Sequence, residues 1–196
     1  MRRILIIDNY DSFTFNLVQQ MGALGGGDIR VMRNDVHPDL AIAYRPTHLL
    51  ISPGPGDPSH TGISHALIEH FQGKIPILGV CLGLQLIGAI FGAQVVRAPQ
   101  PVHGELALVQ HDGLGIFADI PNPTPVARYH SLVLAQYDWP ATLEISAWSK
   151  DGLVMGIRHR AIPMLEGVQF HPESFMSPDG DSIMQNFIDL SEVPYR

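Results

Sequence analysis

The chain has 196 residues, with 12 basic and 19 acidic side chains and a formal net charge of −7. We expect one domain over residues 1–196, and hydrophobic residues at 45% with charged ones at 16% exclude a disordered chain. The net negative charge argues against nucleic acid or an anionic membrane as the main partner. No apolar run reaches the roughly 20 residues of a membrane span. The single cysteine, Cys81, excludes an intrachain disulfide and fits a reducing compartment, so we expect a cytoplasmic protein.

The first half of the chain alternates apolar runs with segments of helical periodicity. The expected strands cover residues 4–7, 29–32, 48–51 and 75–80. The expected helices cover residues 13–24, 62–71 and 83–91. Strand, helix and strand within about 30 residues form a βαβ unit, so the repeat predicts an α/β sandwich with a mostly parallel central sheet.

The second half is richer in strands. Short strands are expected around residues 106–110, 126–129, 143–149, 153–158 and 165–170, separated by turns containing Pro, Gly and Asp. A last helix is expected over residues 181–190. No low-complexity linker or internal repeat interrupts the chain, which favours one domain throughout.

The most informative stretch surrounds Cys81. An apolar strand leads to this residue, which is flanked by Gly79 and Gly83, and a helix follows. Small flanking residues permit a sharp turn of the nucleophile-elbow type, and a helix N-terminus favours the thiolate. The amide of Leu82 would then face an oxyanion that forms beside the sulfur. A small buried hydrophobe is the alternative interpretation of a lone cysteine, and the two glycines leave both interpretations open.

Two other stretches carry polar groups suited to chemistry. An apolar strand ends at His171, with Glu173 two residues further on; a cysteine nucleophile needs such a base, and the base needs an acceptor. A capping or surface histidine is the alternative. The Pro/Gly-rich loop 52–58 follows another strand and could present backbone N–H groups to a ligand, although an ordinary turn has the same composition.

Taken together, five motifs resemble one known family over essentially the whole chain. They are Asp8-Asn9-Tyr10-Asp11-Ser12-Phe13, Ser52-Pro53-Gly54-Pro55-Gly56-Asp57-Pro58, Gly79-Val80-Cys81-Leu82-Gly83-Leu84-Gln85, Arg128-Tyr129-His130-Ser131-Leu132 and Phe170-His171-Pro172-Glu173-Ser174. The chain resembles the class I, triad-type glutamine amidotransferases, and most closely the small glutaminase subunits that serve chorismate-using synthases. The resemblance implies a three-layer, flavodoxin-like α/β fold.

The resemblance also implies residue roles. Cys81 matches the nucleophile that attacks the glutamine carboxamide, His171 the general base and acid, and Glu173 the residue that orients it. The N–H groups of Gly54 and Leu82 match the family's oxyanion hole. The positions matching the glutamine pocket are Gly54, Pro55, Gly56, Gln85, Ser131 and Leu132.

Such glutaminases deliver ammonia to a synthase partner, so the resemblance implies a heteromeric complex with a separate synthase polypeptide (component I). We expect the partner to be anthranilate synthase, in tryptophan biosynthesis. The alternative is that the chain serves aminodeoxychorismate synthase, in folate biosynthesis, or both synthases. No cofactor is expected on this chain, and Mg²⁺ is expected only on the synthase. A free-standing Cys-His-Glu hydrolase resembling a γ-glutamyl peptidase is a further alternative. A non-catalytic binding module is disfavoured because the three triad residues are intact.

One stretch departs from the family pattern. After Val102-His103-Gly104 a Lys is expected, but Glu105-Leu106-Ala107 is present. Because the family places this stretch near the partner interface and the glutamine pocket, the departure puts the identity of the partner and its mode of activation in doubt.

Ten histidines raise the possibility of a metal site. His60, His65 and His70 are five residues apart, which separates successive side chains by about 140° around a helix. That spacing does not gather ligands, and no HExxH or CxxC motif is present, so we expect no metal site.

Overall fold

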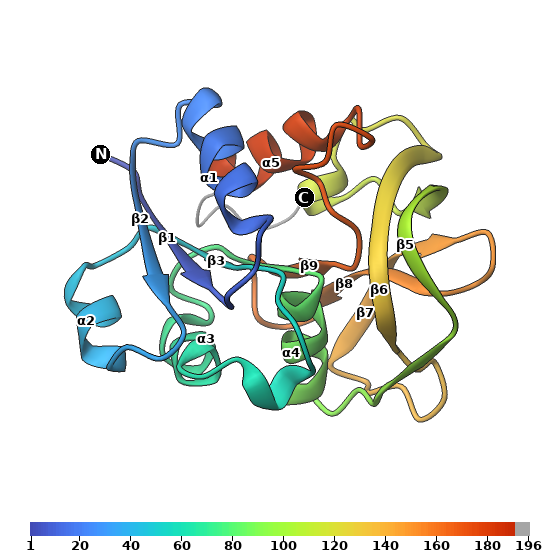
Figure 1. The fold of residues 1–196 in the computed structure, drawn as a ribbon, viewed down its shortest axis with the longest axis horizontal. Coiled ribbons are helices and arrows are strands. Elements are labelled where there is room, and N and C mark those ends of the chain that lie inside the picture. The colour runs from blue at the N-terminus through green and yellow to red at the C-terminus, as the bar shows by residue number, and fades with distance from the viewer. Residues whose placement is uncertain (191–196) are drawn as a thin grey trace.

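The computed structural model describes residues 1–190, in which nine strands form one sheet with helices on both faces (Figure 1). The strand order is β2-β1-β3-β4-β9-β8-β7-β5-β6. The strands are β1 Arg3–Asp8, β2 Asp28–Arg33, β3 His48–Ile51, β4 Ile77–Val80, β5 Val95–His111, β6 Thr124–Leu134, β7 Leu143–Ser149, β8 Val154–His159 and β9 Leu165–Val168. The helices are α1 Thr14–Ala23, α2 Pro38–Ala43, α3 Ser64–Phe71, α4 Leu82–Ile90 and α5 Gly180–Asp189, with 3₁₀ turns at Pro58–His60 and Gly115–Phe117.

The strands β2, β1, β3, β4 and β9 pair in parallel. The apolar residues of β1, β3, β4 and β9 are buried on both faces, whereas those of the edge strand β2 are partly buried. On one face Ile4 and Leu50 pack in a core that includes Leu17 of α1 and Phe187 of α5. The other face packs against α2, α3 and α4, and Figure 1 shows the two groups of helices on opposite sides of the sheet. This arrangement confirms the expected three-layer α/β fold.

The strands β8, β7, β5 and β6 continue the same sheet with antiparallel pairing. The predicted strands 143–149 and 153–158 closely match β7 and β8. The predicted strands at 106–110 and 126–129 lie within β5 and β6, but the expected short lengths are wrong, because β5 has 17 residues and β6 has 11. Register shifts at Arg97/Val102 and His103/Glu105 interrupt the alternation on which a strand prediction depends, which is why the longer strands were missed.

The short helix α2 was not expected. Its N-terminus is capped by His37, whose Nδ1 accepts a hydrogen bond from the Asp39 N–H, and Pro38 occupies the first helical turn. Only Ala41 is buried in its six residues, so no amphipathic stripe marks it in the sequence. Among residues 1–190, no helix is long and apolar enough to cross a membrane.

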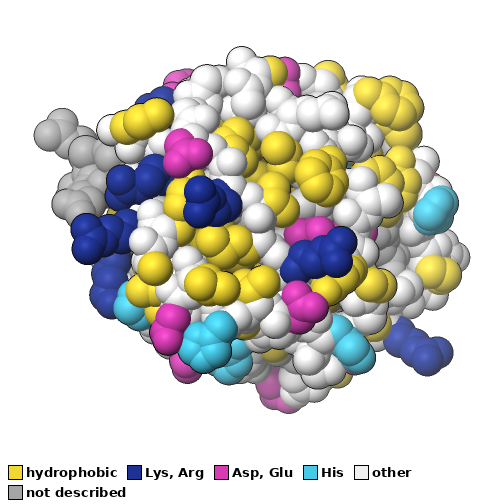
Figure 2. All heavy atoms as spheres, turned by 60° about the vertical axis from the view of Figure 1, so that its left-hand side comes forward, with side chains coloured by type: hydrophobic (Ala, Val, Ile, Leu, Met, Phe, Trp, Pro, Cys, Tyr) yellow, Lys and Arg dark blue, Asp and Glu magenta, His cyan; other side chains and the backbone are white. Residues whose placement is uncertain are grey.

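The strand β2 forms one edge of the sheet and carries the exposed Arg30 and Arg33. Charged side chains on an edge strand discourage pairing with another chain. Figure 2 shows this side of the molecule, where Lys and Arg side chains stand among acidic, histidine and hydrophobic ones.

Candidate active site

Cys81 occupies the sharp turn between β4 and α4, as the flanking glycines predicted. Its backbone dihedrals are φ 54° and ψ −102°, a region that side-chain-bearing residues rarely adopt. A Cβ atom on Gly79 would lie 2.4 Å from the Gly83 carbonyl, and one on Gly83 would lie 2.5 Å from the Ile51 oxygen. Both positions therefore need glycine because the backbone segments approach too closely for a side chain.

His171 and Glu173 form a buried pair just beyond β9. His171 Nδ1 lies 2.6 Å from Glu173 Oε1, and the two side chains are 2% and 0% exposed. The backbone of His171 is anchored, because its N–H donates to Ala127 O at 3.0 Å and its carbonyl accepts from Ser177 Oγ at 2.7 Å. The imidazole Nε2 is buried and makes no hydrogen bond within residues 1–190, so it is available for proton transfer.

The topology explains why the sulfur and the imidazole meet. The strands β4 and β9 are parallel neighbours, with Val80 opposite Val168, so their carboxyl ends lie side by side. Burial lowers the pKa of His171, but the proximity of Cys81 and Glu173 outweighs it and raises that pKa to about 10. The ring is therefore an imidazolium at neutral pH.

Two aromatic rings enclose this imidazolium. The centroids of the Phe13 and Tyr129 rings lie 5.1 Å and 5.2 Å from that of His171, and the two rings are 5.1 Å apart. Both rings meet the imidazole in T-shaped arrangements, with interplanar angles of 65° for Phe13 and 72° for Tyr129.

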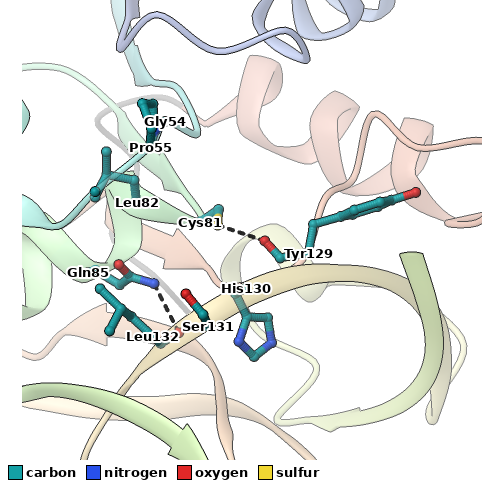
Figure 3. Close-up of a pocket in the computed structure, with 10 residues that line it drawn as sticks. Gly54, Pro55, Cys81, Leu82, Gln85, Tyr129, His130, Ser131 and Leu132 are labelled. Atoms are coloured by element: carbon teal, nitrogen blue, oxygen red, sulfur yellow. Dashed lines mark hydrogen bonds between the residues drawn. The ribbon is translucent and has the colours of Figure 1, made fainter. Parts of the chain in front are cut away.

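The Cys81 sulfur has two further polar neighbours. Gln169 Nε2 donates to Sγ at 3.5 Å. The Tyr129 carbonyl accepts from the thiol at 3.8 Å (Figure 3). Gln85 Nε2 donates both to Gln169 Oε1 and to Leu132 O, each at 3.1 Å. The sequence reasoning gave Gln169 no role, although alternation places it on the same face of an extended segment as His171.

A pocket of about 150 Å³ opens beside the sulfur (Figure 3). The residues that line it are Gly54, Pro55, Gly56, Cys81, Leu82, Gln85, Tyr129, His130, Ser131 and Leu132. All six positions expected to hold glutamine are among them. Figure 3 shows Gly54, Pro55 and Leu82 on one side and residues 129–132 of β6 on another, with the Tyr129 ring turned away from the pocket.

Sequence reasoning placed Tyr129 and His130 within a motif but did not assign them to the site. Burial, together with the positive charge of Arg128, lowers the pKa of His130 to about 4. Arg128 Nε donates to His130 Nε2 at 3.1 Å, so this imidazole is a neutral acceptor at physiological pH.

The loop after β3 is held in place by a buried polar network. Asn9 N–H donates to Ser52 Oγ and Asn9 Nδ2 donates to Ser52 O, both at 2.9 Å. Asn34 Nδ2 donates to Asn9 Oδ1 and to His60 O at 2.9 Å. A Cβ atom on Gly54 would lie 2.5 Å from the Asn9 Cβ, so the loop is packed tightly against this network.

The Glu105-Leu106-Ala107 stretch lies on β5 and does not line the pocket beside the sulfur. Leu106 and Ala107 instead line a separate hollow of about 510 Å³ with Leu108, Arg128 and residues 149–151. Leu106 and Leu108 are 58% and 56% exposed, so the stretch presents an apolar surface. Within residues 1–190, no three His, Cys, Asp or Glu side chains are grouped so that they could hold a metal ion.

The fold and the site define a class of protein: an α/β enzyme with a cysteine at an elbow, a buried His–Glu pair beside it and a small polar pocket. This arrangement suits acyl transfer from an amide or ester to a thiol. The model of the family "Glutamine amidotransferase class-I" matches residues 5–190. The chain belongs to this class-I glutamine amidotransferase family.

Curated relatives are similar over nearly their full length. Aminodeoxychorismate synthase component 2 of Serratia marcescens is 51% identical, covering 94% of this chain and 98% of the relative. Aminodeoxychorismate/anthranilate synthase component 2 of Bacillus subtilis is 49% identical, covering 95% of each. Anthranilate synthase component 2 of Cyanophora paradoxa is 46% identical, covering 94% and 97%.

The bifunctional protein TrpGD of Thermotoga maritima is 45% identical over all of this chain, which spans only 33% of that longer protein. Among solved structures, a putative GMP synthase subunit from Thermoplasma acidophilum has a TM-score of 0.84 and 28% identity. The match covers 96% of this chain and 92% of the archaeal one.

Proposed function

We propose that the chain hydrolyses L-glutamine through a thioester on Cys81 and passes the ammonia to a chorismate-aminating synthase. The observation that supports this proposal most strongly is that Cys81 lines a small pocket and also interacts with His171, which the buried Glu173 holds through Nδ1. That pocket is lined by all six positions that match the family's glutamine site.

In the first half of the reaction, the Cys81 thiolate attacks the side-chain carboxamide carbon of glutamine and a C–S bond forms. The His171 imidazolium then gives its proton to the leaving nitrogen, the C–N bond breaks and ammonia departs. A carboxylate hydrogen-bonded to Nδ1 keeps the Nε2 proton directed at the reacting atoms, which is the role of Glu173.

In the second half, the neutral His171 takes one proton from water while the hydroxide joins the thioester carbon. The C–S bond breaks, sulfur leaves as thiolate, and glutamate is released from the regenerated thiolate–imidazolium pair. The N–H groups of Gly54 and Leu82 stabilise the oxyanion in both halves. Every step uses groups of this chain, so we assign no cofactor to it and place the Mg²⁺ requirement on the synthase.

The names of the relatives support a chorismate-using synthase as the partner, because they include component 2 of anthranilate synthase and component 2 of aminodeoxychorismate synthase. The identities of 46%, 49% and 51% do not discriminate between anthranilate synthase, aminodeoxychorismate synthase and service to both. Ammonia that reaches water becomes ammonium, which is not a nucleophile, so transfer within a complex follows from the chemistry. The component 2 names of these relatives agree with a heteromeric complex.

Reconstitution tests this proposal. The chain is mixed with each chorismate-using synthase from its source, supplied with chorismate and glutamine, and the product is identified. Anthranilate alone assigns the chain to tryptophan synthesis, aminodeoxychorismate alone to folate synthesis, and both products to a shared subunit. Rapid glutamine hydrolysis by the isolated chain with neither product would replace the proposal with a free-standing hydrolase.

A further inference from the structure

Gln169 is fully buried and contacts Cys81 and Gln85, two residues that line the pocket. Its Nε2 lies 3.5 Å from Cys81 Sγ, and its Oε1 lies 3.1 Å from Gln85 Nε2. The mechanism above gives this side chain no role. A buried polar group of this kind stabilises the fold only when its hydrogen-bonding groups find partners.

The neighbours of Gln169 determine which end of its amide faces the sulfur. Gln85 must present Nε2 to the Leu132 carbonyl, because a carbonyl only accepts hydrogen bonds. The same Nε2 group reaches Gln169, which therefore turns Oε1 towards Gln85 and its N–H donor towards Sγ. The orientation of this donor is thus specified by the wall of the pocket.

We propose that Gln169 stabilises the Cys81 thiolate by donating a hydrogen bond to it, and that Gln85 holds the Gln169 amide in the orientation this requires. The inference rests on the proposed function, since it adds a group that acts on the same nucleophile. A fixed amide dipole aimed at a charged sulfur in a water-poor site acts more strongly than the same group in water.

The titratable groups around this sulfur come from several elements. His171 and Glu173 lie beyond β9, His130 is on β6, and Asp11 before α1 interacts with His171 and Glu173. None of them is replaced in the test, so a change in the titration of Cys81 reports on Gln169 itself.

The test measures how fast iodoacetamide alkylates the intact chain as a function of pH, by whole-protein mass spectrometry. The chain has one cysteine, so all of the signal comes from Cys81. We expect Gln169→Leu to raise the pH midpoint of alkylation by about one unit, equivalent to a tenfold lower thiolate fraction below the midpoint. Gln169→Glu should raise it further, because a negatively charged carboxylate replaces the N–H donor beside the sulfur.

Gln169→Leu separates this role from a structural one, because this variant adds no charge beside the sulfur. A residue that only supports the pocket wall would leave both the alkylation midpoint and kcat of Gln169→Leu unchanged. The proposal predicts a fall in kcat of at least about tenfold with KM within about threefold, measured on the reconstituted complex. An unchanged midpoint in Gln169→Leu, with an increase in KM alone, would overturn the proposal.

Gln185→Leu is the matched control, because Gln185 bonds Asp189 on α5 rather than any residue of the pocket. It should alkylate with the same midpoint as the unsubstituted chain. Alkylation needs neither glutamine turnover nor a synthase. A shifted midpoint in a chain that fails to hydrolyse glutamine would therefore refute the proposed function and still support the role of Gln169.

Discussion

His171 interacts with Glu173 and with Cys81, and each of these two groups raises its pKa. The carboxylate of Glu173 lies 2.6 Å from Nδ1, while Nε2 is left for the sulfur and the substrate. Both side chains are almost fully buried, so little solvent screening weakens their interaction.

Replacing Glu173 with Gln should therefore change both the imidazole and the reaction. We expect the pKa of His171 to fall below about 10 and kcat for glutamine hydrolysis to fall by at least about 100-fold. NMR titration of the imidazole and steady-state kinetics measure the two effects. A His171 pKa that does not move in Glu173→Gln would show that the carboxylate has no part in it.

The same pair makes stability depend on pH. The folded-state pKa of His171 lies above its ordinary value of 6.5, so the contribution is complete below pH 6.5 and is lost as pH rises towards about 10. The difference in the free energy of unfolding between the unsubstituted chain and Glu173→Gln should shrink over this interval. Denaturant melts at several pH values measure it, and a difference that grows with pH would contradict this account.

At the residue scale, the sequence was enough to predict the residues that carry distinctive chemistry, the cysteine nucleophile and its His–Glu pair. Cys81, His171 and Glu173 stand in motifs that the structure brings to one place, and the six expected pocket residues line one cavity. The roles of Gln169 and Asn34 were not predicted, because no local sequence pattern distinguishes a buried amide that supports a loop from one that contacts a sulfur. Only the tertiary partners distinguish these roles.

At the scale of elements, the turn between β4 and α4 concentrates backbone strain on Cys81. Its φ of 54° suits glycine, which lacks the Cβ that makes this region unfavourable. We expect Cys81→Gly to be more stable than Cys81→Ala by about 1 kcal/mol, the reverse of the usual order. Chemical denaturation of the two inactive variants measures the difference, and the usual order would show that the turn is unstrained.

The loop after β3 depends on Asn34, the residue that directly follows β2. Asn34→Ala removes hydrogen bonds to Asn9 Oδ1 and to the His60 carbonyl. The loss should cost about 1–3 kcal/mol and also lower kcat, because the loop carries Gly54 and Gly56.

Asn186→Ala provides the matched control for this variant. Asn186 Nδ2 also donates to two carbonyls, those of Ile116 and Ala118, but it lies on α5. We expect a comparable loss of stability with kcat unchanged. If both variants lowered kcat equally, the loop network would have no specific role in the reaction.

Elements with strong periodicity were predictable, and those shaped by long-range pairing were not. The buried parallel strands and the helices α1, α3, α4 and α5 follow from local pattern. The lengths of β5 and β6 depend on their pairing with each other across two register shifts. The approach of residues 129–132 to Cys81 depends on that pairing, so the shape of the pocket is not a local property of the sequence.

At the scale of the whole molecule, one continuous sheet builds the site from its two halves. The parallel half supplies the elbow of Cys81, and β6 of the antiparallel half supplies the opposite pocket wall (Figures 1 and 3). The hollow lined by Leu106 and Ala107 also lies against β6, next to Arg128. The departure in the Glu105-Leu106-Ala107 stretch thus alters an exposed surface and leaves the pocket itself unchanged.

The most direct test compares the unsubstituted chain with Cys81→Ala in the reconstituted synthase complex, with glutamine or ammonia as the nitrogen source. We predict that Cys81→Ala abolishes glutamine-dependent product and leaves ammonia-dependent product at its normal rate, because only the release of ammonia uses this sulfur. Co-purification of the variant with the synthase confirms that the complex is intact. Continued glutamine-dependent synthesis by Cys81→Ala would contradict the central claim that this chain releases ammonia from glutamine through Cys81.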